Sequence, residues 1–135
     1  MSCVFCEAPL TAGEAVYEDE RMLVLLHPDG SPRGHAMVVA KRHVENASEL
    51  DEDEGLHLLR IWQRVERALL ALTGAERAVL LKLGIVTPHF HLHIYPVAAA
   101  DSREEVFAAF DGKRGTPRDA AFVAELRARL TGGAR

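Results

Sequence analysis

The sequence predicts an α+β domain in which a mostly antiparallel sheet of about five strands packs against one long helix. Three observations support this fold class. Short β-rich segments occupy residues 15–41, an apolar pattern with a helical period covers 48–73, and two more β-rich segments precede a helical C-terminal extension over about 101–131. Because 135 residues is a typical length for a single domain and the sequence shows no internal repeat, we expect one domain over residues 1–135.

The first part of the chain alternates between strand and turn signals. Residues 15–26 predict a hairpin, because two apolar runs flank a charged turn at 18–21. Residues 27–34 are dense in turn formers and predict a loop. A further strand is expected over 35–41, in which His35, Met37 and Val39 share one face.

The long helix is indicated by apolar residues that recur three and four positions apart. These residues are Leu58, Trp62, Val65, Leu69 and Leu72. An acidic first turn at 51–54 suits the positive end of the helix dipole, and Gly74 is the expected stop. We expect the apolar stripe to pack onto the sheet or onto a second copy of itself. His57 has no partner nearby in sequence, and we interpret it as structural or solvated.

The segments after this helix predict a strand and two shorter helices. Residues 78–83 are a candidate for a buried strand. A capping pattern at Asp101 and Glu104 predicts a short helix that ends at Gly112. A last helix is expected to start at 116–117 and to close at 132–133.

Residues 89–96 carry three histidines that alternate with apolar residues. In a β-strand, this alternation places His89, His91 and His93 on one face and the apolar side chains on the other. Residues on the same face lie roughly 6.5–7 Å apart along a strand, so His91 is expected to have an imidazole on each side. With seven histidines in 135 residues, chance gives such a triple at a given position about once in ten thousand. We therefore interpret this segment as functional.

The overall composition excludes several classes of protein. The chain is 48% hydrophobic and 27% charged, as in ordinary globular domains. Its net charge of −4 offers no broad basic surface, so we expect no DNA or RNA polymer as the main partner. No stretch reaches about 18 apolar residues, and the first ten residues lack the pattern of a signal peptide. We expect no membrane segment and a cytoplasmic location.

Cys3 and Cys6 are the two cysteines of the chain, and their spacing allows three interpretations. The pair could be redox-active, half of a zinc site, or a coincidence. The redox interpretation is weaker, because only two residues precede Cys3 and a thioredoxin-type pair follows a strand. A zinc site would need two further ligands, which the seven histidines could supply.

The histidine segment also indicates a type of chemistry. An imidazole held by a hydrogen bond at one nitrogen can attack an electrophile with the other. Phosphorus is a suitable electrophile, because catalysis there depends mainly on positioning and charge stabilisation. No serine or cysteine nucleophile and no acidic pair for glycoside chemistry stands out in the sequence.

This segment resembles the His-φ-His-φ-His-φ-φ signature of the histidine triad family of nucleotide hydrolases and transferases. Residues 3–6, 16–21 and 32–43 agree with the same family in order and spacing, and the resemblance covers about residues 3–96. It implies an antiparallel sheet that is commonly paired into a homodimer. It also implies transfer of a nucleoside monophosphate to the middle histidine, followed by release to water.

The resemblance implies specific roles for residues of this chain. His91 would be the nucleophile on the α-phosphorus, His93 a ligand of phosphate or leaving-group oxygens, and His35 a supporting histidine. The implied ligands of a structural zinc ion are Cys3, Cys6, His43 and His89. Such a zinc ion would tie the N-terminus to the catalytic strand and should not activate water.

The resemblance further implies a nucleotide site. We expect this site to be formed by Val4, Phe5, Leu25, His27, Gly84, Thr87 and His93. Val4 and Phe5 match positions that line the base pocket. His27 stands where members of the family usually carry an acidic or amide residue that holds the ribose hydroxyls. Thr87 is the side chain expected to contact phosphate.

Three hypotheses about function follow. The leading one is hydrolysis of a dinucleoside polyphosphate or a nucleoside phosphoramidate through a covalent intermediate on His91. The second is a nucleotidyltransferase that passes the nucleotide to an acceptor other than water. The third is a zinc-stabilised nucleotide-binding module without turnover.

Overall fold

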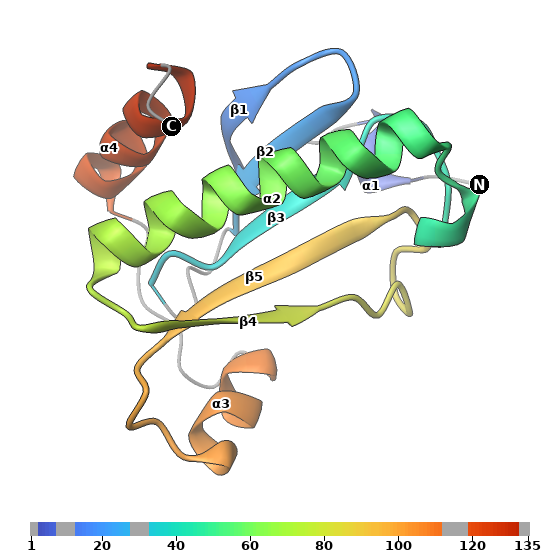
Figure 1. Ribbon diagram of the computed structural model, residues 1–135. Helices are drawn as coiled ribbons and strands as arrows, with labels where there is room; N and C mark the ends of the chain where they lie inside the picture. Colours follow the sequence, from blue (N-terminus) through green and yellow to red (C-terminus); the bar gives the residue numbers. More distant parts are fainter. Residues whose placement is uncertain (1–2, 8–12, 28–32, 112–118, 133–135) are drawn as a thin grey trace.

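The fold is built around one sheet, seen in a computed structural model that describes residues 3–7, 13–27, 33–111 and 119–132. Five strands lie in the order β1-β2-β3-β5-β4, and each neighbouring pair is antiparallel (Figure 1). The strands are β1 (Glu14–Glu18), β2 (Met22–Leu26), β3 (Ala36–Ala40), β4 (Arg77–Leu81) and β5 (His91–Val97). The predicted α+β class with an antiparallel sheet of about five strands is confirmed.

Helices flank this sheet on both sides. The described helices are α1 (Val4–Glu7), the 3-10 helix η2 (Ala47–Glu49), α2 (Glu52–Thr73), α3 (Arg103–Phe110) and α4 (Ala120–Thr131). Figure 1 shows α2 lying across one face of the sheet, and α4 packs against both α2 and β1. None of these helices is long and apolar enough to cross a lipid bilayer. The cytoplasmic location stays a prediction.

The strands β2 and β3 are buried on both faces, which explains their continuous apolar sequence. Side chains of one face, such as Val24 and Val38, pack with α2 and α4 in the larger core. Side chains of the opposite face form a smaller core with Phe5 of α1. This smaller core contains Leu23, Leu25, Met37 and Val39. The short helix α1 therefore covers a sheet face that α2 leaves open.

Local signals in the sequence set both ends of α2. The Asp51 side chain accepts the N–H of Glu54, and the Glu54 carboxylate accepts the N–H of Asp51, which completes a capping box. Gly74 ends the helix with a φ of 75°, a left-handed conformation that glycine adopts without strain. The helix starts later than the predicted residue 48, because residues 47–49 form the separate turn η2.

Side chains cap the N-termini of the last two helices. The capping box of α3 joins Ser102 and Glu105, one residue later than the predicted pair Asp101 and Glu104, because the Ser102 hydroxyl accepts the N–H of Glu105. The side chain of Asp119 caps α4 by accepting two N–H groups of its first turn. The predicted signals at 112, 116–117 and 133 lie outside the described residues.

Candidate active site and metal cluster

The histidine segment lies in the interior of the sheet, on the face that α1 covers. The register pairs Val39 with His91 and Met37 with His93, so the side chains of His91 and His93 belong to the same face as the smaller core. The strand itself begins at His91, which corrects the prediction of a strand from residue 89. The reason is that the N–H of the preceding residue bonds to the carbonyl of Val44, outside the β4–β5 ladder.

His91 is fixed by a hydrogen bond to the backbone. Its Nδ1 atom lies 2.7 Å from the carbonyl oxygen of His89. A carbonyl oxygen only accepts, so Nδ1 donates and the neutral ring carries its lone pair on Nε2. Burial lowers the pKa of His91 below its usual value, which favours this neutral form. The ring of Phe5 packs against His91 with a centroid separation of 4.8 Å.

His93 is bonded to a histidine from a neighbouring strand. The Nε2 atom of His35 lies 2.8 Å from Nδ1 of His93. Burial lowers the pKa of His93 to about 3, with smaller contributions from the charges of His91 and His27, so the His93 ring is neutral near neutral pH. The rings of His91 and His93 meet edge to face at 4.9 Å. Two neutral imidazoles therefore lie side by side, each with one nitrogen committed to a hydrogen bond.

His35 is the middle ring of a stack of three. The ring of His27 lies 4.4 Å from that of His35 at an interplanar angle of 12°, and Tyr95 lies on the other side at 4.0 Å and 21°. The structure thus brings His27 next to the two histidines predicted to be functional. Tyr95 was not among the predicted site residues. The alternation that marks His91 and His93 continues to residue 95, and this signal could have found it.

The four predicted metal ligands come together at the edge of α1. Nδ1 of His43 lies 2.9 Å from Nδ1 of His89, and Sγ of Cys6 lies 3.1 Å from Nδ1 of His43. Sγ of Cys3 lies 3.4 Å from Nδ1 of His89. All four ligand atoms lie within 4.8 Å of one another. Cys3 directly precedes α1, Cys6 lies within it, His43 follows β3, and His89 lies two residues before β5.

The donor atoms of this cluster suit a metal ion. Nε2 of His89 lies 2.5 Å from the carbonyl oxygen of Ala40, so Nε2 donates and the lone pair of His89 lies on Nδ1, the atom in the cluster. In a tetrahedral zinc site, sulfur and nitrogen ligands lie about 3.5 Å apart, given bond lengths of about 2.3 and 2.1 Å. The observed sulfur–nitrogen separations of 3.1 and 3.4 Å are close to that value. Cys3, Cys6, His43 and His89 could therefore bind a metal ion.

A charge pair that the sequence does not reveal holds the segment carrying His43. Nε and Nη2 of Arg42 donate to the two carboxylate oxygens of Glu54 at 3.0 and 2.7 Å. This bidentate pair ties the residue before His43 to the first turn of α2. No local pattern links residues 12 positions apart across a turn, so sequence reasoning missed this contact.

The remaining residues that were predicted to bind the nucleotide lie in β2, in α1 and in the loop after β4. Leu25 is fully buried beneath α1, in the smaller core with Phe5. Gly84 has a φ of 67° in the loop that follows β4, and Thr87 lies half-buried near the end of the same loop. Val4 belongs to α1 and is half-buried.

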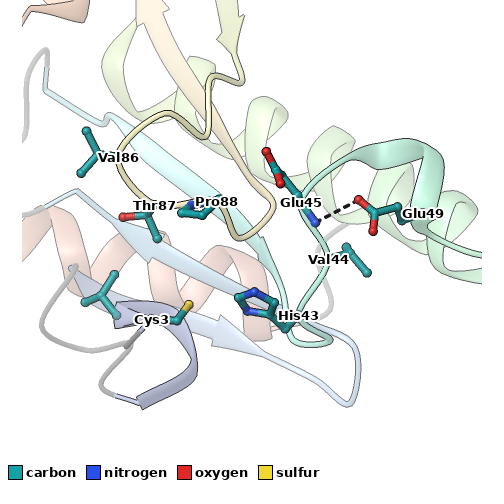
Figure 2. A pocket seen from close by; sticks show the side chains of 9 residues that line it. Cys3, His43, Val44, Glu45, Glu49, Val86, Thr87 and Pro88 are labelled. Carbon is teal, nitrogen blue, oxygen red and sulfur yellow. Dashed lines mark hydrogen bonds between the residues drawn. The ribbon is translucent and has the colours of Figure 1, made fainter. Parts of the chain in front are cut away.

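A pocket of about 460 Å³ opens where this loop meets the metal cluster. Figure 2 shows Cys3 and His43 on one side of it, facing Thr87 and Pro88 on the other. Val4 also lines the pocket. Two predicted nucleotide residues, Val4 and Thr87, thus border the same space as two predicted metal ligands.

Comparison with known proteins identifies the family. The family model described as the HIT domain matches residues 11–99, a span that contains the histidine segment and all five strands. The chain belongs to the HIT family. This membership confirms the resemblance inferred from the histidine alternation.

Relatives of this HIT protein are found in bacteria and in yeast. An uncharacterized HIT-like protein of Mycobacterium tuberculosis is 32% identical over 110 residues, which are 75% of each chain. An adenosine 5'-monophosphoramidase of Schizosaccharomyces pombe is 31% identical over 103 residues, 71% of this chain and 74% of the relative. The crystal structure of a zinc-bound histidine triad family protein from Mycobacterium smegmatis matches with a TM-score of 0.68 at 27% identity, covering 98% of this chain and 95% of that chain.

Proposed function

We propose that this HIT protein hydrolyses a dinucleoside polyphosphate or a nucleoside phosphoramidate through a covalent nucleotidyl intermediate on His91. The observation that carries this proposal is the hydrogen bond from Nδ1 of His91 to the carbonyl of His89, which leaves the Nε2 lone pair for attack. The similarity to a yeast monophosphoramidase supports hydrolysis as the type of reaction.

The proposed reaction has two steps. In the first, the lone pair on Nε2 of His91 attacks the α-phosphorus, an N–P bond forms, and the bond to the leaving group breaks. In this proposal His35 donates to Nδ1 of His93, so the neutral ring of His93 holds its proton on Nε2 and gives it to the leaving group. In the second step, water attacks the phosphorus, its proton passes to His93, and the N–P bond breaks.

The nucleotide itself would lie between α1 and the loop before β5. We assign the base to Val4, Phe5 and the Leu25 side of the smaller core. His27 would face the ribose, and its stacking on His35 would hold it there. Thr87 and the backbone at Gly84 would contact phosphate oxygens.

We propose that the metal is zinc and that its role is structural. Four protein ligands fill a tetrahedral site, so the ion supplies no activated water and instead fixes its ligands in space. Cys3 and Cys6 flank Phe5, which packs against His91. The zinc site would therefore hold α1 over the catalytic strand. The zinc-bound structure from Mycobacterium smegmatis supports the choice of metal.

The experiment for the reaction is a hydrolysis panel with trapping of the intermediate. The purified protein is expected to cleave at least one dinucleoside polyphosphate or nucleoside phosphoramidate, and His91→Asn is expected to abolish turnover. A variant at position 91 as active as the wild type would contradict the proposal. Faster discharge of the trapped intermediate by an added phosphate acceptor than by water would indicate a transferase, and nucleotide binding without turnover would indicate a binding module.

We also propose that the whole chain forms one domain and that two copies form a homodimer. The support for a dimer is the edge strand β4, where Val79 and Leu81 are only half-buried and where Leu83, 56% exposed, follows. Sedimentation of the purified protein tests this state. A monomer at all concentrations would contradict it.

A further inference from the structure

A second pocket lies on the same face of the sheet as the catalytic histidines. Its volume is about 540 Å³. Leu23 and Val39 contribute to its lining, and both side chains are buried. Phe5 is also part of its lining, and the same ring packs against His91. The proposed chemistry uses Phe5 but leaves this space without a role.

The rim of this pocket is charged, in contrast to its floor. Lys41 and Glu18 both line the pocket, and Nζ of Lys41 lies 2.5 Å from a carboxylate oxygen of Glu18. Both side chains reach solvent, with exposed fractions of 35% and 59%. An apolar floor with a few polar groups at the edge suits a flat ring whose edge carries hydrogen-bonding atoms.

Strand register relates this pocket to the catalytic residue. Val39 is paired with His91, and Leu23 is paired with Val39 on the next strand. Neighbouring strands lie about 4.8 Å apart, so the floor begins one strand from His91 and extends to about 10 Å from it. A group attached to a phosphorus atom at His91 could span this distance.

Of the residues expected to bind the nucleoside, Leu25 and His27 lie in other rows of the sheet, whereas Phe5 borders both spaces. Leu25 is paired with Met37, which is paired with His93, so Leu25 lies in the row of His93. His27 follows the end of β2, two residues beyond Leu25, and stacks on His35. The second pocket instead occupies the row of His91 and continues toward Lys41. In an in-line displacement, the transferred nucleoside and the leaving group extend from the phosphorus in different directions.

We infer that this second pocket binds an aromatic ring in the leaving group of the substrate. The inference rests on the proposed function and deepens it by naming the leaving group. The ring could be the second nucleobase of a dinucleoside polyphosphate or the side chain of an aromatic amine in a phosphoramidate. Either ring would lie on Leu23 and Val39, against Phe5.

The test uses a substitution at the rim that would narrow the entrance of the pocket. Glu18→Trp places a large ring at an exposed strand position, where aromatic residues are well tolerated. Glu125→Trp is the matched control, because Glu125 is exposed on α4 and belongs to the opposite side of the sheet. Glu18→Ala removes the ion pair without filling the pocket. The three substrates are a symmetrical dinucleoside triphosphate, a nucleoside phosphoramidate of benzylamine, and the matching phosphoramidate of ammonia.

Glu18→Trp is expected to lower kcat/KM about tenfold for leaving groups with a ring and less than about twofold for ammonia, because burying one ring contributes on the order of a tenfold effect. Loss with the dinucleotide alone identifies a nucleobase as the ring, and loss with benzylamine alone identifies an amine. Equal losses with all three substrates would place the transferred nucleotide in this pocket and overturn the inference. No loss would also overturn it.

A binding measurement separates this inference from the proposed function. In His91→Asn protein, the two substrates with a ring in the leaving group should bind about tenfold more tightly than the ammonia phosphoramidate. Adding Glu18→Trp should remove this difference, and adding Glu125→Trp should not. Equal affinities in the His91→Asn protein overturn the inference, whether or not the wild type turns over any substrate.

Discussion

The Nε2 atom of His35 lies 2.8 Å from Nδ1 of His93, and it joins a residue outside the histidine alternation to one inside it. His35 is 3% exposed and is stacked on Tyr95, so its ring has little room to move. The bond therefore commits Nδ1 of His93 to His35. The orientation of Nε2, the other nitrogen of His93, is fixed as a result.

His35→Ala should lower kcat by about 10- to 100-fold, the usual cost of losing a residue that orients a functional histidine. His35→Gln should recover part of this loss, because its amide N–H can replace the donor. Steady-state kinetics on one substrate measure the effect. His57→Gln is the control, since His57 lies on α2 and bonds to Asp19. Equal activity of the Ala and Gln variants would argue against a donor role.

Acidification should destabilise the protein through His93. Burial lowers the pKa of His93 from 6.5 to about 3, so between these values the unfolded chain binds a proton that the folded chain does not. The neutral His93 ring makes its full contribution to the free energy of unfolding above the unfolded pKa of 6.5. This contribution is lost as the pH falls toward the folded pKa of about 3. Between about pH 7 and pH 5, urea unfolding of the wild type should lose about 1–2 kcal/mol more than that of His93→Gln. Equal losses would contradict the assignment.

Alternation along one strand predicted which histidines share a sheet face, because strand periodicity is a local property of the chain. It did not predict that His89 leaves the strand, since that depends on a hydrogen bond between the next residue and distant Val44. The helix over 4–7 was also missed, because four residues are too few to show a period. Local signals thus predicted the elements, and only the folded structure revealed several of the pairings.

His57 illustrates the same limit. We interpreted it as structural or solvated, and the structure places its Nε2 atom 2.6 Å from a carboxylate oxygen of Asp19. The hydroxyl of Tyr17 donates to the same oxygen, and two backbone N–H groups donate to the other. This cluster ties α2 to the turn between β1 and β2, across 38 residues of sequence.

Asp19→Ala should destabilise the protein by about 2 kcal/mol, because four hydrogen bonds to one carboxylate are lost. Burial alone would raise the pKa of Asp19, but these hydrogen bonds outweigh it and lower the pKa from 3.8 to about 2. The ionised form therefore contributes stability that is present above pH 3.8 and is lost as the pH falls through about 2. Urea unfolding near neutral pH measures the effect, with the exposed neighbour Glu20→Ala as control. A loss no larger than that of the control would contradict this account.

Gly34 precedes His35 and cannot be replaced without strain. Its φ is 88°, and an added Cβ would lie 3.1 Å from Pro96 and 3.3 Å from Phe122. Gly34→Ala should therefore cost about 1–3 kcal/mol of stability and should lower kcat by displacing His35. Gly55→Ala is the matched control, because Gly55 lies within α2 with open space around it, and it should stabilise the protein by about 0.5–1 kcal/mol. Thermal unfolding distinguishes the two, and a Gly34→Ala variant as stable as the wild type would contradict the strain argument.

The metal cluster should control the position of α1. This helix has only four residues, and it is held over the sheet by Phe5 and by the cysteines on either side of that ring. His43→Asn should lose the metal, about one zinc per chain in the wild type, whereas His57→Asn should retain it. Elemental analysis measures this difference. Because Phe5 packs against His91, loss of the metal should also raise KM and lower the unfolding temperature. A metal-free wild type with an unchanged unfolding temperature would show that the apolar contacts of Phe5 are sufficient to hold α1.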